Sequence, residues 1–174
     1  DRALVLPHHV TGYISACYAL GFERSMEMMA TRSDLVTYIA DRFATGDRIR
    51  MRQLKEIGCD AVLITDAWAS CDIISVEMFD RYALPYQIHA AEAARAEGLK
   101  SVFWGEGNVI PVLDRAAPLP VDAYAIEQTR KNFELTVSQV RKVFGPKRCL
   151  FGNLDSETLL LRNNPEEIRK AVED

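Results

Sequence analysis

The sequence predicts an α/β fold built on a parallel β-sheet. Five short apolar runs alternate with longer segments in which apolar residues recur at helical spacing. The runs are apolar without interruption, as in "AVLI" at 61–64, which is typical of strands that are buried on both faces and joined by helices. The 174 residues are 48% hydrophobic and 26% charged, a composition typical of a single globular domain.

The predicted strands are apolar runs that end in polar residues. The clearest is 59–68 ("CDAVLITDAW"), in which an aliphatic run is followed by polar side chains. The first, 3–10, is expected to end in a turn at Pro7-His8-His9. The other predicted strands are 99–107, 121–128 and 148–155.

Helices are predicted between the strands from periodicity and from end signals. Gly58 is a natural C-cap, and Pro85 is expected to kink or break the helix in which it lies. Thr136 and Gln139 have the spacing of a capping box, which marks a helix start. The predicted helices are 12–30, 33–58, 75–97, 109–117, 136–145 and one that begins at Asn164.

Two architectures fit this order of elements. A five-stranded doubly wound sheet would be complete at this length. A (β/α)₈ TIM barrel needs about 250 residues, so the chain would be an incomplete portion of about five βα units. The abrupt start, almost inside an apolar strand, and the end in a newly begun helix favour the barrel, with 1–174 as one domain truncated at both ends.

Charge and hydropathy exclude several classes of function. A net charge of -4 and a pI near 5.5 argue against nucleic acid or an anionic membrane as the main partner. No apolar run approaches the roughly 20 residues that span a bilayer, and the start does not resemble a signal peptide, so we expect a cytoplasmic protein. Cys59 and Cys149 each open an apolar run and are expected to be small buried hydrophobes.

Polar side chains gather where the predicted strands end. In parallel sheets ligands bind at the carboxyl ends of the strands, so this enrichment predicts an enzyme. Because neighbouring residues on a strand face opposite sides, at most one of His8 and His9 should face such a site. The polar residues concerned are His8, His9, Asp66, Glu106, Asn108, Glu127, Asn153 and Asp155.

Several segments, taken together, resemble the uroporphyrinogen decarboxylase-like superfamily. The most specific is "GCDAVLITDAWASCDIISVEMFDRYALPY" at 58–86, and further similar segments are 98–108, 122–128, 144–160 and 164–174. The resemblance implies a (β/α)₈ barrel, of which this chain would be the central to C-terminal part. It also implies one of two activities: decarboxylation of uroporphyrinogen acetate side chains without a cofactor, or methyl transfer between a corrinoid carrier and a small molecule, aided by zinc.

The superfamily comparison makes "WGEGN" the most informative short motif. The methyltransferase branch commonly carries His-x-Cys-Gly-Asn here, with His and Cys as zinc ligands, whereas this chain has Trp104 and Glu106 at those two positions. Glu106 could bind a metal only as an oxygen donor, which suits a thiolate-exchange site poorly. On the decarboxylase side, the resemblance aligns Tyr18, or alternatively Tyr13, with a substrate-contacting tyrosine, and a substrate-contacting serine is replaced by Ala67.

These observations lead to a specific hypothesis. Methyl transfer between a methylated or methoxylated substrate and a corrinoid on a partner protein is expected, with uroporphyrinogen decarboxylation or a non-catalytic binding module as alternatives. A metal ion such as zinc could take part although the usual motif is missing. The expected catalytic residues are Asp66, Glu106 and His9, with Glu106 also as the candidate metal ligand. The expected substrate-binding residues are His8, Tyr18, Trp68, Trp104, Asn108, Glu127 and Asn153.

Overall fold

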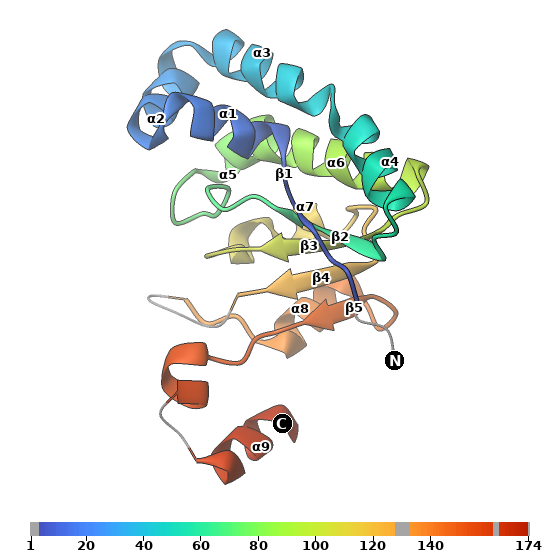
Figure 1. Ribbon diagram of the computed structural model, residues 1–174. Helices are drawn as coiled ribbons and strands as arrows, with labels where there is room; N and C mark the ends of the chain where they lie inside the picture. Colours follow the sequence, from blue (N-terminus) through green and yellow to red (C-terminus); the bar gives the residue numbers. More distant parts are fainter. Residues whose placement is uncertain (1–3, 128–132, 162–163, 174) are drawn as a thin grey trace.

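A computed structural model describes residues 4–127, 133–161 and 164–173 and contains one parallel sheet. The strands lie side by side in the order in which they occur along the chain (Figure 1). A doubly wound sheet would reverse direction at a switch point, so this order is that of a barrel wall and confirms an incomplete (β/α)₈ arrangement. The strands are β1 His8–Val10, β2 Ala61–Thr65, β3 Lys100–Gly105, β4 Ala123–Ile126 and β5 Cys149–Phe151.

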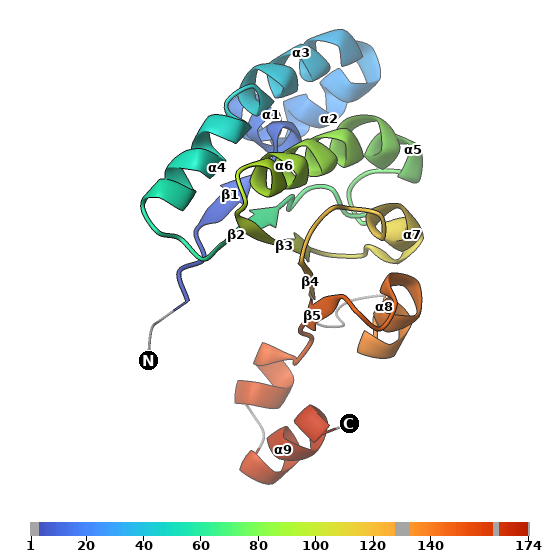
Figure 2. The ribbon, with the colours of Figure 1, turned by 90° about the vertical axis from the view of Figure 1, so that its right-hand side faces the viewer.

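Among the described elements, helices cover one face of the sheet and leave the other open. Figure 2 shows α6, α7 and α8 along the outer side of the strands, with η3 and α9 beyond β5. No helix in the described ranges is long and apolar enough to cross a membrane. The helical segments are α1 Gly12–Leu20, α2 Phe22–Thr31, α3 Ser33–Ala44, α4 Asp47–Glu56, α5 Val76–Met78, η1 Phe79–Ala83, α6 Leu84–Ala96, η2 Ile110–Val112, α7 Leu113–Ala116, α8 Val137–Phe144, η3 Ser156–Leu160 and α9 Pro165–Glu173.

The hydrophobic core lies between the sheet and these helices. Ile64, Phe103 and Tyr124 stand in register on β2, β3 and β4, and each is at most 3% exposed. Helix α6 packs against β2 and β3 through buried alanines such as Ala90 and Ala94, whose small side chains let the helix approach the strands closely. The next row of the sheet faces the open side, where Trp104 and Ala125 are partly buried and Phe151 is 51% exposed.

Glycine and proline divide the predicted long helices. The 12–30 helix is two helices, because Gly21 between them adopts a φ of 86°, outside the helical region. The 33–58 helix is also two helices, α3 and α4, which are separated at Thr45-Gly46. Pro85 lies in the first turn of α6, directly after the π-helical segment η1, where its missing N–H costs little. The expected break is therefore only a change of helix type, because the backbone stays helical from α5 through η1 into α6.

Two sequence expectations near the ends of the sheet are wrong. Pro7-His8-His9 is not a turn, because the Pro7 carbonyl accepts a hydrogen bond from the Leu63 N–H and His8 and His9 continue the ladder as part of β1. Cys149 is exposed, because it lies on β5 at the edge of the sheet, whereas Cys59 is buried as expected. The predicted end of the fourth strand at 128 lies outside the described residues.

Candidate functional site

The open face of the sheet carries a cleft at the carboxyl ends of β3, β4 and β5. Glu106 and Glu127 directly follow Gly105 and Ile126, which pair across β3 and β4, and Asn153 follows β5. These positions share one side of the sheet because side chains alternate along each strand. The cleft has a volume of about 570 Å³. Its lining residues are Trp104, Glu106, Ala125, Ile126, Glu127, Phe151, Gly152, Asn153, Leu154 and Ser156.

Packing requires both glycines that flank Glu106. A Cβ at Gly105 would collide with the phenol ring of Tyr124, which is buried on the helix-facing side. A Cβ at Gly107 would lie 2.6 Å from the Ser70 hydroxyl oxygen, and the φ of Gly107 is +70°. The Gly-Glu-Gly sequence therefore lets the backbone pass closely between Tyr124 and Ser70 while it presents one carboxylate.

Hydrogen bonds fix the loop that carries Glu106. The Gly107 N–H donates to the Glu127 carboxylate at 2.7 Å, which joins the ends of β3 and β4. The Asn108 N–H donates to the Asp72 carboxylate at 2.7 Å, and the Asn108 carbonyl accepts from the Cys71 N–H at 2.9 Å. The Asn108 side chain accepts from the Ile110 N–H at 3.3 Å. Asn108 thus holds two loops together, a position that favours an anchoring role over substrate contact.

An aromatic cluster of Tyr18, Phe22 and Trp68 lies near this loop. The rings of Tyr18 and Phe22 each meet the Trp68 ring edge-on, with centroids 5.2 and 5.1 Å apart. Burial raises the pKa of Tyr18, and the negative charges of Glu106 and Asp66 raise it further. Glu106 therefore acts electrostatically on Tyr18, although α1 and β3 are far apart in the sequence.

Asp66 lies on the helix-facing side of the sheet and is 3% exposed. It accepts hydrogen bonds from the Thr11 hydroxyl at 2.8 Å and from the Gln87 amide at 3.0 Å, which connects β2 to α1 and α6. Burial raises the pKa of Asp66 to about 7, and the two hydrogen bonds partly offset this. This enclosed position favours an anchoring role for the carboxyl group.

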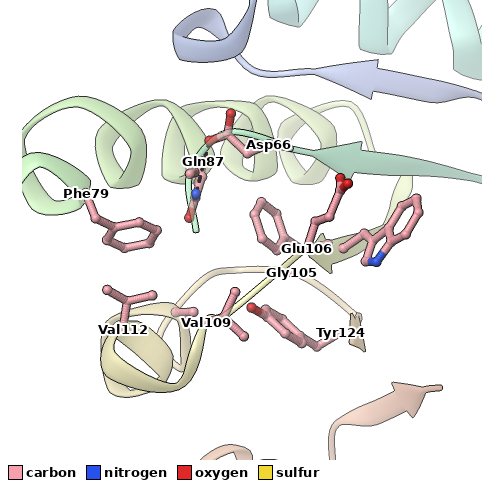
Figure 3. A pocket seen from close by; sticks show the side chains of 12 residues that line it. Asp66, Phe79, Gln87, Gly105, Glu106, Val109, Val112 and Tyr124 are labelled. Atoms are coloured by element: carbon pink, nitrogen blue, oxygen red, sulfur yellow. Dashed lines mark hydrogen bonds between the residues drawn. The ribbon is translucent and has the colours of Figure 1, made fainter. Parts of the chain in front are cut away.

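Asp66 and Glu106 also line a small cavity of about 10 Å³ (Figure 3). In this view Glu106 extends to one side of the β3 backbone at Gly105 and Tyr124 to the other, while Asp66 and Gln87 stand together near α6. The volume is about that of one water molecule, so the cavity is too small for an organic substrate. The 570 Å³ cleft at the strand ends has room for one.

The two histidines of β1 face opposite sides of the sheet, as the alternation predicts. His9 is buried, with its Nε2 3.3 Å from a carboxylate oxygen of Asp47 at the start of α4. His8 is exposed on the open face, and its Nε2 lies within hydrogen-bond distance of the Thr65 hydroxyl. The side chain available to the open face is therefore that of His8, whereas His9 packs between β1 and α4.

The structure brings only part of the predicted site together. Trp104, Glu106, Glu127 and Asn153 line one cleft, and Trp68 and Tyr18 form a separate aromatic cluster beside the loop. Phe151 is a lining residue that the sequence argument missed, although its place in the alternation of the 148–155 run could have indicated it. The contact of Phe22 with Trp68 carries no sequence signal, because it joins segments that are distant in the chain.

The donor atoms around Glu106 do not suit the zinc site of the methyltransferase branch. The described neighbours in the cleft that could coordinate a cation are oxygen donors such as Glu127 and Asn153, and Trp104 offers no ligand atom. Within the described ranges, no three His, Cys, Asp or Glu side chains are grouped so that they could hold a metal ion. The residues present therefore do not fit a thiol-activating zinc ion.

Comparisons with known proteins agree with this architecture. A solved methyltransferase from Methanosarcina mazei superposes with a TM-score of 0.84 at 20% identity, over 98% of this chain and 48% of that one. The chain is 27% identical over 144 residues to the methylcobamide:CoM methyltransferase MtbA of Methanosarcina mazei, covering 81% of this chain and 40% of the relative. It is 32% identical over 120 residues to the uroporphyrinogen decarboxylase of Chlorobaculum parvum, covering 67% of this chain and 31% of the relative.

These relatives carry two different activities, and the chain spans less than half the length of each. The likeness in structure establishes the barrel fold and does not choose between the activities. The model of the uroporphyrinogen decarboxylase (URO-D) family matches residues 12–174, which include every strand after β1 and all of the cleft. The chain therefore belongs to the uroporphyrinogen decarboxylase (URO-D) family.

Proposed function

We propose that this chain forms part of an enzyme that transfers a methyl group between a methylated small molecule and a corrinoid carried by a partner protein. The observation that supports methyl transfer over decarboxylation is the charge of the cleft. Glu106 and Glu127 line it, and its described lining contains no Lys, Arg or His. Uroporphyrinogen carries many carboxylates, and carboxylate side chains in the lining would oppose its binding.

The chain's own part in such a reaction is to hold the methyl donor. The corrinoid would supply the nucleophile, cob(I)alamin, from outside the chain. Trp104 and Phe151 offer apolar surface in the cleft, while Glu106 and Glu127 offer acceptor atoms that fix the donor's orientation. Because the Gly107 N–H holds the Glu127 carboxylate at 2.7 Å, this group needs little reorganisation when a donor binds.

The direct test supplies cob(I)alamin and a panel of methylated and methoxylated donors to the protein that carries this chain, and follows methylcobalamin formation by absorbance. We expect transfer from at least one donor, and a loss of roughly 10- to 100-fold in kcat/KM in Glu106→Gln, as for a lost hydrogen bond to a charged group. Glu92→Gln on the exposed side of α6 is the matched control and should leave the rate unchanged. Turnover of uroporphyrinogen, with no methyl transfer from any donor, would reverse the assignment to the decarboxylase activity.

A further inference from the structure

We propose that the narrow cavity of about 10 Å³ behind the Glu106 loop binds one water molecule, which bridges the side-chain oxygen of Gln87 and the hydroxyl group of Tyr124. Such a water would join α6, which carries Gln87, to β4, which carries Tyr124. The inference does not depend on the proposed function. Its polar walls come from α6, from β4 and from Asp66 at the end of β2, on the side of the sheet that the helices cover.

Gln87 brings a hydrogen-bond acceptor into this cavity. Its side chain is buried, at 1% exposed, and its Nε2 donates to the Asp66 carboxylate at 3.0 Å. The nitrogen and oxygen of an amide point in different directions, so Oε1 is turned away from Asp66 (Figure 3). This oxygen has no hydrogen-bond partner among the described residues. A buried amide oxygen that stays unpaired costs free energy, and a bound water removes that cost.

Tyr124 brings a hydrogen-bond donor to the same cavity. Its ring packs between Phe103 and Phe144, with centroids 5.6 and 4.5 Å away, which fixes the hydroxyl group against Gly105 in the lining. Burial raises the pKa of Tyr124, and no hydrogen bond with a described residue contributes to this rise. An O–H donor and an amide acceptor, both buried, therefore line one small space.

The size and polarity of the cavity suit a single water. A volume of about 10 Å³ is the least that holds one, and a buried water needs two to four polar partners. Gln87 and Tyr124 supply two of them. Asp66 supplies a third, because each of its oxygens accepts one hydrogen bond from the described residues and can accept a second. The remaining walls, such as Phe79 and Val109, are apolar and leave the water no other partner of their own.

Tyr124→Phe tests the proposal by the sign of its effect on stability. The substitution keeps the ring and removes only the hydroxyl group. If a water accepts from that group, its loss should lower the folding equilibrium constant by about 2- to 10-fold in urea denaturation of the protein that carries this chain. If the cavity is dry, the substitution removes an unpaired buried hydroxyl group and should stabilise the protein instead, and that result would overturn the proposal.

A double-mutant cycle tests whether Gln87 and Tyr124 act through a shared partner. Gln87→Met and Tyr124→Phe should be coupled by at least about 2-fold in the folding equilibrium constant, because each removes one side of the bridge. Thr11→Val is the matched control for Gln87→Met, since Thr11 also donates to Asp66, at 2.8 Å, but does not line the cavity. It should show no coupling with Tyr124→Phe. Additive effects of Gln87→Met and Tyr124→Phe would count against a bridging water.

A high-resolution crystal structure of the whole protein locates the water directly. We expect one ordered water within hydrogen-bond distance of both Gln87 Oε1 and the Tyr124 hydroxyl oxygen, and we expect it to persist in the Thr11→Val variant. A cavity that holds no ordered water at this position, or one that a side chain fills, would refute the proposal.

Discussion

Replacement of Gly107 by alanine tests whether the Glu106 loop is held by close backbone packing. The new Cβ would lie 2.6 Å from the Ser70 hydroxyl oxygen and 2.7 Å from the Ser70 Cβ, whereas ordinary contacts begin at 3.4 Å. The φ of +70° adds a left-handed penalty of about 1 to 2 kcal/mol. Overpacking typically costs a further 1 to 3 kcal/mol, so we expect a total loss of about 2 to 5 kcal/mol.

Gly98→Ala is the matched control for this substitution. Gly98 has nearly the same φ, +66°, but nothing lies within 4 Å of the position that its Cβ would take. It should therefore lose only the left-handed penalty of about 1 to 2 kcal/mol. The difference between the two variants isolates the close contacts of the new Cβ with Ser70 and with the Asp72 carboxylate.

Urea denaturation followed by circular dichroism measures both variants in the protein that carries this chain. The Gly107→Ala variant should unfold at a clearly lower urea concentration than Gly98→Ala with a similar slope, since the same surface is exposed in both cases. The affinity of the cleft for a methyl donor should fall only in Gly107→Ala, because Glu106, which lines the cleft, is the neighbour of Gly107. Equal losses of stability in the two variants would show that the contacts with Ser70 and Asp72 are relieved without cost, and the packing argument would fail.

Two further predictions concern a buried carboxyl group and a helix start. Burial raises the pKa of Asp66 to about 7, so its stabilising contribution is complete below about pH 4 and is lost as pH rises through 7. Asp66→Asn should remove this pH dependence, whose total change in the free energy of unfolding is roughly 4 kcal/mol at most. Parallel stability–pH curves for the variant and the parent would contradict the raised pKa. Thr136→Ala removes a side chain that caps α8 in a complete capping box with Gln139. It should cost about 1 kcal/mol in urea denaturation, and a loss near zero would contradict the cap.

The parts of the fold that were predicted correctly rest on local signals. The apolar run 61–64 predicted β2. The spacing of Thr136 and Gln139 predicted a capping box, and both of its hydrogen bonds are present. Helix breaks were predicted less well, because Gly21 and Gly46 lie within otherwise periodic segments. Periodicity reports which residues are apolar, but it does not report where the backbone leaves the helical region.

In the candidate site, too, some residues were placed correctly from the sequence and others were not. The sequence placed Glu106 and Glu127 at strand ends, and the parallel arrangement then brought them into one cleft. It could not show that Asp66 turns toward Gln87, because which face a residue takes just past a strand end depends on the helices packed there. The same holds for His9, whose neighbour Asp47 is contributed by α4.

The sequence by itself determined the class of fold, the strands and the polar residues that follow them, because periodicity, caps and strand-end composition are properties of neighbouring residues. Only the tertiary structure decided which of those polar residues share a cleft and why Glu106 stands between two glycines. Gly105 faces Tyr124 and Gly107 faces Ser70, and both contacts join residues that are far apart in the chain. Such contacts form only when the strands are aligned side by side, so they leave no local pattern in the sequence.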